Sequence, residues 1–277
     1  GGNGQLATCI KDLESSYNNL KIIYTDSQEL DITDLKAVEI FFENNTVDYC
    51  INCAAYTAVD LAENDREKAI LINEVGAKNL AIVCQTNNST LIHISTDFVF
   101  DGKQSNFYSE EDATNPISVY GQTKLQGEIQ IQNHLTKYYI LRTSWLYSEH
   151  GNNFMKTMIK LSKEKDQLSV VVDQIGTPTY ATDLASVILK LITTNNTQFG
   201  IYHYSNEGVA SWYDFAKAIF EEIGSKIKLL PIKSMAYPTP AQRPQFSVLD
   251  KSKIKNTLQI EIPHWRDSLR KAILNYD

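Results

Sequence analysis

Short apolar runs alternate with longer amphipathic segments along the first half of the chain, and this alternation restricts the fold more than any other feature. Strand-like runs at 20–24, 47–52, 91–95 and 138–142 are separated by helical patterns at 8–18, 34–44, 63–87 and 119–135. Strands joined by crossover helices pair in parallel, and helices then cover both faces of the sheet. The sequence therefore predicts an α/β fold with a Rossmann-type, doubly wound parallel sheet.

Small residues at the start of the chain indicate a dinucleotide site. Gly1-x-x-Gly4-x-x-Ala7 precedes the first helical pattern, where small residues let the backbone approach a pyrophosphate at a helix N-terminus. Asp26 ends the next strand-like run, where a carboxylate can bind ribose hydroxyls and favours NADH over NADPH; an ordinary surface turn is the alternative. A strand normally precedes such a loop, so we expect residues that are missing before Gly1.

Three side chains are predicted to meet where the 91–95 strand ends. Ser95-Thr96-Asp97 closes this strand, and Tyr120 and Lys124 lie one turn apart on the helix that follows. The pKa of free tyrosine is about 10, and a nearby ammonium lowers it. Thr96 can then orient a carbonyl oxygen while Tyr120 protonates it. The hydride requires a cofactor, because no side chain supplies one.

Longer motifs continue this pattern over essentially the whole chain. They are Ser-Thr-Asp-Phe-Val-Phe-Asp-Gly at 95–102, Tyr-Gly-Gln-Thr-Lys-Leu-Gln-Gly-Glu at 120–128, Arg-Thr-Ser-Trp at 142–145, Gly-Asn-Asn-Phe at 151–154, Asp-Gln-Ile-Gly-Thr-Pro-Thr at 173–179 and Ala-Tyr-Pro-Thr-Pro-Ala-Gln-Arg-Pro at 236–244. On these residues the chain resembles the extended short-chain dehydrogenase/reductases, and more narrowly the dTDP-4-dehydrorhamnose reductases. The resemblance implies reduction of the 4-keto group of dTDP-4-dehydrorhamnose to dTDP-L-rhamnose with NADPH or NADH.

The resemblance also implies which residues form the site. The catalytic set is Thr96, Tyr120 and Lys124. The cofactor set adds to Tyr120 and Lys124 the residues Gly1, Gly4, Gln5, Leu6, Asp26, Asp31, Ile32, Ala54, Ala55 and Thr57. The substrate set is Thr96, Asp97, Phe98, Trp145, Asn153, Gln174 and Arg243. Arg243 stands in a proline-rich loop at 231–244 and can grip a diphosphate with both of its terminal nitrogens.

The sequence predicts two lobes. Beyond residue 147 we expect helices at 152–165, 182–193 and 211–223, the last capped by Ser211, and strands at 168–172, 201–204 and 227–230, with a closing helix near 263–269. Residues 1–147 and 174–196 are predicted to form the dinucleotide-binding domain. Residues 148–173 and 197–277 are predicted to form a smaller α+β lobe for the nucleotide sugar. Thr33 is the expected cap of the helix at 34–44.

The overall composition excludes several classes of partner. The net charge is −7 with both signs mixed along the chain, which does not predict a nucleic-acid partner. No apolar run reaches about 18 residues, so no membrane span is predicted and the cytoplasm is the expected location. The four cysteines and five histidines lack the spacing of metal ligands, so no structural metal is predicted, and a bridging magnesium at a dimer interface stays open. A homodimer is the default expectation for assembly.

Three other functions are considered beside the reductase. Sugar-nucleotide 4,6-dehydratases have Thr-Asp-Glu at the strand end. The third position here is Phe98, which cannot titrate, so dehydration is disfavoured. The regulatory subunit of methionine adenosyltransferase also resembles these reductases and is not an enzyme. The complete set of Thr96, Tyr120 and Lys124 favours catalysis, and a reductase or epimerase of another nucleotide sugar is the further alternative.

Overall fold

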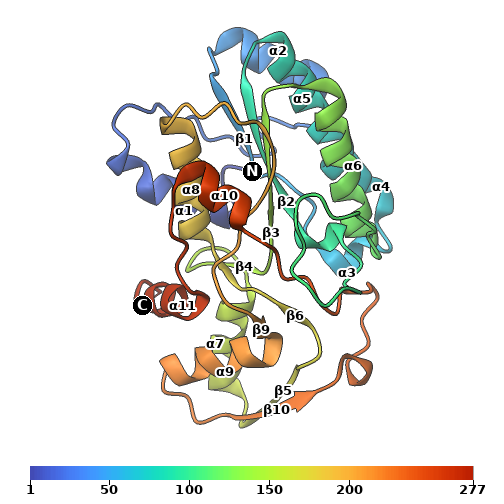
Figure 1. Ribbon diagram of the computed structural model, residues 1–277, viewed down its shortest axis with the longest axis vertical. Helices are drawn as coiled ribbons and strands as arrows, with labels where there is room; N and C mark the ends of the chain where they lie inside the picture. The colour runs from blue at the N-terminus through green and yellow to red at the C-terminus, as the bar shows by residue number, and fades with distance from the viewer. Residues whose placement is uncertain (277) are drawn as a thin grey trace.

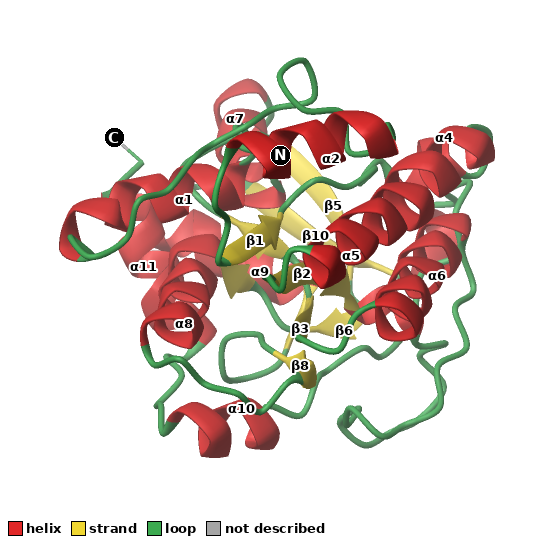
Figure 2. Ribbon diagram, turned by 90° about the horizontal axis from the view of Figure 1, so that it is seen from above, coloured by secondary structure: helices red, strands yellow, loops and turns green. Residues whose placement is uncertain are grey.

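A four-stranded parallel sheet forms the centre of the computed structural model, which describes residues 1–276. Its order is β1-β2-β3-β8, from β1 (Tyr49–Asn52), β2 (Thr90–Thr96), β3 (Tyr138–Thr143) and β8 (Gly200–His203). The helices α1 (Gln5–Leu13) and α8 (Ala181–Thr193) cover one face, and α5 (Gly76–Thr86) and α6 (Val119–His134) cover the other (Figure 2). The predicted parallel sheet between two helical layers is confirmed.

Alternate residues of the strands supply two separate cores. Ile92, Tyr139 and Leu141 pack with α1 and α8. Leu91 and Ile140 point to the other face and pack with α5, α6 and α2 (Leu35–Asn44). Side chains on both faces are buried because a parallel sheet has no solvent-exposed face. This rigid sheet fixes the strand ends from which the candidate site is built.

The smaller lobe lies below the ends of the strands (Figure 1). It contains α7 (Phe154–Glu164), α9 (Trp212–Glu222) and α11 (Trp265–Leu274), with the parallel pair β5 (Gln167–Val171) and β10 (Lys228–Ile232). Short pairs join β4 (Leu146–Tyr147) to β7 (Thr179–Tyr180) and β6 (Ile175–Gly176) to β9 (Ala210–Ser211). As predicted, Ser211 caps α9, in a reciprocal pair with Asp214.

The predicted strand at 20–24 is wrong. Leu20, Ile22 and Tyr24 pack partly buried against the first core, but this segment pairs with no strand within residues 1–276. A strand requires a neighbour for its ladder of hydrogen bonds. Here the main-chain partner is the first loop, where the Gly2 N–H donates to the Thr25 carbonyl at 2.7 Å.

The strand predicted at 201–204 also lies elsewhere than expected. It forms β8, which pairs with β3 from Tyr139–Gly200 to Arg142–His203, so it belongs to the main sheet and not to the smaller lobe. The helix α8 packs along α1 and returns the chain to the sheet edge. The helix α10 (Ser252–Leu258) then contacts β8 and adds Ile254 and Leu258 to the first core.

Several helix boundaries differ from the predictions. The helix α1 begins at Gln5 and ends at Leu13, and Asp34, not Thr33, caps α2 by accepting from two backbone N–H groups. The long helix predicted at 63–87 consists of α3 (Val59–Ala62), α4 (Arg66–Ile70), a π-helical turn at Leu71–Val75 and then α5. No helix within residues 1–276 combines the length and apolarity needed to span a bilayer.

Candidate active site

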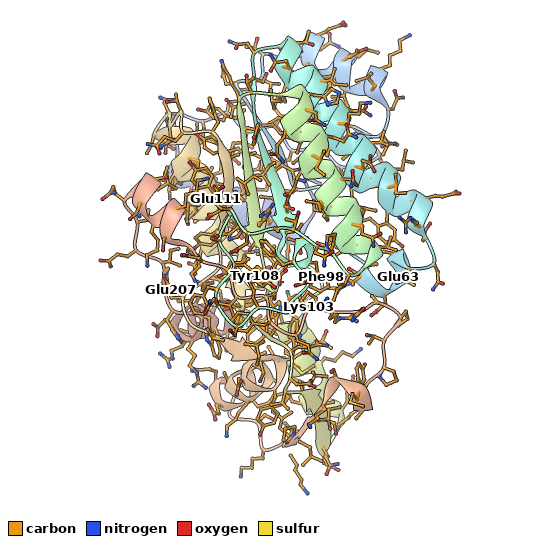
Figure 3. The ribbon with its side chains drawn as sticks, turned by 45° about the vertical axis from the view of Figure 1, so that its right-hand side comes forward. Glu63, Phe98, Lys103, Tyr108, Glu111 and Glu207 are labelled. Carbon is orange, nitrogen blue, oxygen red and sulfur yellow. The ribbon has the colours of Figure 1, made fainter. Side chains whose placement is uncertain are left out.

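The end of β2 and the start of α6 meet at the centre of the candidate site. Ser118 caps α6 by accepting from the Gly121 N–H at 3.2 Å. A Cβ atom at Gly121 would lie 2.2 Å from the Phe98 carbonyl oxygen, so only glycine permits this close approach. Tyr120 consequently packs edge-on against Phe98, with ring centroids 5.6 Å apart, and its phenol lies near the side chain of Thr96. Phe98 lies between the sheet and the smaller lobe (Figure 3).

The electrostatics of Tyr120 differ from the expectation. Burial raises the pKa of Tyr120 to about 12; the neighbouring Thr96 side chain opposes this shift and the charge of Asp97 adds to it. Lys124 is not among the groups that shift the pKa of the phenol, and its Nζ contacts other partners. Lys124 Nζ donates to the Ile94 carbonyl at 2.6 Å and lies 3.1 Å from His93 Nε2. Burial lowers the pKa of Lys124 to about 8.

Asp97 is a buried connection between the two lobes. The hydroxyl of Ser247 donates to its Oδ2 at 2.5 Å, and that of Thr96 donates to its Oδ1 at 3.1 Å. Burial raises the pKa of Asp97 to about 6, and these hydrogen bonds limit the shift. Asp97 therefore links the segment around Ser247 to the end of β2 by hydrogen bonds. Its place in the Ser-Thr-Asp motif did not indicate this role.

The residues predicted to bind a cofactor gather at the first loop. A Cβ atom at Gly1 would lie 2.6 Å from the Ala54 nitrogen, and the N-cap Gly4 leaves the first turn of α1 without any side-chain cap among residues 1–276. Asp26 accepts a hydrogen bond from Asn3 at 2.7 Å. The loop, the segment around Asp26 and the turn at Ala54 are thus adjacent.

Other predicted cofactor residues have mainly structural contacts. The Asp31 carboxylate accepts from the Thr33 N–H and hydroxyl within one turn, and the Ile32 side chain packs against Gly76. Ala55 is half-buried and Thr57 is exposed in the turn that follows β1. Leu6 is buried in the first core.

Gln5 links the two predicted sets of binding residues. Its Nε2 donates to the Leu146 carbonyl at 3.3 Å, and Asn153 Nδ2 donates to its Oε1 at 3.4 Å. Asn153 also caps α7 through the Lys156 N–H. Asn153 therefore has a clear structural role at the boundary between the lobes.

The remaining predicted substrate residues face partners that the sequence did not single out. Trp145, at a φ of 45°, stacks on Trp212 with ring centroids 3.6 Å apart and planes 9° from parallel. Arg243 forms a bidentate ion pair with Asp60, at 2.7 Å for Nη2–Oδ2 and 3.0 Å for Nη1–Oδ1. Gln174 is half-buried between β5 and β6. Asp60 and Trp212 were missed because each lies far along the chain from its partner.

No group of three or more His, Cys, Asp and Glu side chains in the described part of the chain could hold a metal ion. The four cysteines form no disulfide among residues 1–276, and Cys9 and Cys84 are fully buried, as small apolar side chains commonly are.

Comparison with known proteins gives a consistent assignment. The family model described as the RmlD substrate binding domain matches residues 1–277. A dTDP-4-dehydrorhamnose reductase of Aggregatibacter actinomycetemcomitans is 41% identical over 280 residues, which covers 98% of this chain and 95% of that protein.

Two solved structures of the same description are also similar. A dTDP-4-dehydrorhamnose reductase from Clostridium acetobutylicum is 43% identical, with a TM-score of 0.95 over 99% of this chain and 97% of that one. A second from Bacillus anthracis, solved in complex with NADP, is 40% identical, with a TM-score of 0.96 over 99% and 97%. The chain therefore belongs to the dTDP-4-dehydrorhamnose reductase family of the extended short-chain dehydrogenase/reductases.

Proposed function

We propose that this protein reduces the 4-keto group of dTDP-4-dehydrorhamnose to give dTDP-L-rhamnose, with NADPH or NADH as the hydride donor. The observation that carries the proposal is that the Tyr120 phenol lies near the side chain of Thr96 at the buried end of β2. Relatives that are named for this activity cover nearly the whole chain, and one of them binds NADP, which supports the same reaction here.

The first loop fits a dinucleotide. A Cβ atom at Gly1 or Gly2 would lie within 3 Å of the backbone of Ala54 or Thr25, respectively, so these positions have no room for a side chain. The free N–H groups of the first turn of α1 can donate to a pyrophosphate. Asp26, which accepts from Asn3 of the first loop, is assigned to the ribose and would favour an unphosphorylated one, whereas the NADP complex of the relative supports NADPH. Both nucleotides therefore belong in the assay.

The chemistry at the substrate oxygen is assigned to two hydroxyls. The nicotinamide supplies the hydride when it is bound. Tyr120 donates the proton to the substrate oxygen, and its pKa of about 12 keeps the phenol protonated at neutral pH. Thr96 is assigned to orient the same oxygen. Lys124, one turn along α6, is assigned to the cofactor ribose.

The lobes divide the binding. The nucleotide domain comprises residues 1–147 and 174–196 together with β8. Residues 148–173 and the remainder of 197–277 form the sugar-nucleotide lobe. Trp145, on its stack with Trp212, provides an apolar wall for the sugar. Arg243 is assigned to the diphosphate, and Asp60 holds its guanidinium in place. Phe98 leaves the site without the additional acid that dehydration needs.

We also propose a cytoplasmic homodimer.

The direct test is turnover of enzymatically generated dTDP-4-dehydrorhamnose with NADPH or NADH, followed by absorbance and by identification of the product by NMR. A matched control substrate is a dTDP-4-keto-6-deoxy hexose that differs in one hydroxyl orientation. The proposal predicts dTDP-L-rhamnose from the first substrate and much slower reduction of the control. Cofactor binding without turnover of either would overturn it, and co-purification with a methionine adenosyltransferase would then favour the regulatory alternative.

A further inference from the structure

A buried line of three polar side chains ends at Lys124. Asn52 at the end of β1 and His93 in β2 are directly paired in the register of the sheet. Asn52 Nδ2 lies 3.0 Å from His93 Nδ1, and His93 Nε2 lies 3.1 Å from Lys124 Nζ. The three residues are 3%, 1% and 1% exposed, so water cannot replace these contacts. Their polar atoms must satisfy one another.

The backbone fixes the orientation of Asn52. The Ala54 N–H donates to Asn52 Oδ1 at 3.0 Å, so the amide oxygen faces the turn and the NH₂ group faces His93. An amide nitrogen only donates, and His93 Nδ1 must therefore accept. Burial holds the pKa of His93 well below its ordinary value, so the ring is neutral whatever the charge of Lys124. Its single proton is consequently on Nε2.

This tautomer has a consequence for Lys124. The Nε2–H of His93 points at Lys124 Nζ, and an ammonium group, which only donates, would place two donors opposite each other. A neutral amine has a lone pair that accepts from His93. One of its two N–H groups then donates to the Ile94 carbonyl at 2.6 Å, and the second stays available. Every contact in the line is satisfied only with the neutral amine.

We propose that Asn52 and His93 are positioning residues that set the protonation of Lys124: Asn52 fixes the Nε2–H tautomer of His93, and His93 biases Lys124 toward its neutral amine. Lys124 is then a group that exchanges a proton near neutral pH and not a permanent positive charge. The use of that proton in turnover rests on the proposed function. Because Ala54 holds Asn52, the turn assigned to the cofactor is coupled to the protonation of Lys124.

The other charged groups around Lys124 do not explain this bias. Glu128, one turn further along α6, and the thiol of Cys53 both raise the pKa of Lys124. Glu128 is itself paired with Arg142 at 2.7 Å, which compensates its charge. Tyr120, on the same helix, is neutral at physiological pH because its pKa is raised. Burial and the His93 contact therefore act against the local negative charge.

The first experiment measures the tautomer in the unmodified protein. Long-range ¹H–¹⁵N NMR on protein labelled at its histidine nitrogens distinguishes a protonated Nε2 from a protonated Nδ1, and loss of one signal set in His93→Gln identifies the residue. The proposal predicts a protonated Nε2 at pH 7. A protonated Nδ1 would overturn it. This measurement requires neither substrate nor turnover, so its result is separate from the fate of the proposed reaction.

The second experiment reverses the tautomer. In Asn52→Asp the carboxylate accepts from both Ala54 and a protonated His93 Nδ1, so Nε2 becomes an acceptor for the ammonium. The pKa of Lys124, followed by the ¹³Cε signal that Lys124→Met removes, should rise by about one unit or more. Direct charge attraction would raise the pKa equally in a His93→Phe background, whereas the proposal predicts a clearly smaller rise there. An equal rise in both backgrounds, or no rise in Asn52→Asp, would overturn the proposal.

Discussion

Replacing Glu128 by glutamine should strongly destabilise the fold, because it breaks an ion pair that has no access to water. Arg142 and Glu128 are 3% and 0% exposed in their side chains. Arg142 donates to the carboxylate from Nη2 at 2.7 Å and from Nε at 3.0 and 3.2 Å. Removing one partner of such a pair leaves an uncompensated buried charge, which typically costs about 3–5 kcal/mol. The total free energy of unfolding of a typical domain is about 5–15 kcal/mol, so this loss is a large part of it.

The measurement is the free energy of unfolding of Glu128→Gln in urea at pH 7, followed by circular dichroism. We expect a loss of about 3–4 kcal/mol, since the amide keeps the shape and one acceptor atom. The matched control is Glu128→Leu with Arg142→Met, which removes both charges and should recover most of the loss. A loss below about 1 kcal/mol, the range of exposed ion pairs, would refute the reasoning. Because the pair joins α6 to β3, Glu128→Gln should also slow turnover.

Three further substitutions test the site. Gly121→Ala places a Cβ atom 2.2 Å from the Phe98 carbonyl, and the resulting shift of Tyr120 should reduce kcat about 10²-fold; an unchanged kcat would show that the close contact is unimportant. The pKa of Asp97, about 6, exceeds the value of about 3.9 in an unfolded chain, so stability falls as pH rises between them. Asp97→Asn should remove this fall, so its free energy of unfolding in urea should rise by about 2–3 kcal/mol relative to wild type between pH 4 and pH 7. A difference between the two proteins that does not change with pH would contradict this reasoning. Arg243→Lys loses the bidentate geometry and should raise KM for the dTDP-sugar about tenfold with little change in kcat, whereas an unchanged KM would exclude a diphosphate contact.

Local patterns predicted those features that depend on neighbouring residues. Two patterns were sufficient to predict that Thr96 and Tyr120 lie near each other. They are the apolar run at 91–95 and the i, i+4 spacing of Tyr120 and Lys124. The strand at 20–24 failed for the opposite reason: a strand depends on a neighbour, and its own residues do not specify one.

The contacts that tune the site were not predictable in this way. His93 stands inside an apolar run and is indistinguishable from a core residue until the register places it beside Asn52. Asp60 and Arg243 are 183 residues apart in the chain. The expectation that Lys124 lowers the pKa of Tyr120 used spacing alone, which does not show that Lys124 Nζ reaches the Ile94 carbonyl.

The most direct test of the central claim compares wild type with Tyr120→Phe in the reduction of dTDP-4-dehydrorhamnose, followed by NADPH and NADH absorbance. The substitution removes one hydroxyl and keeps the ring that packs against Phe98. Loss of a positioned proton donor typically lowers the rate 10²–10⁴-fold, about 3–5 kcal/mol of barrier. The account predicts rapid turnover by wild type and a loss in that range for Tyr120→Phe, with cofactor binding retained. Equal turnover by the two proteins would contradict the assignment of Tyr120 as the proton donor.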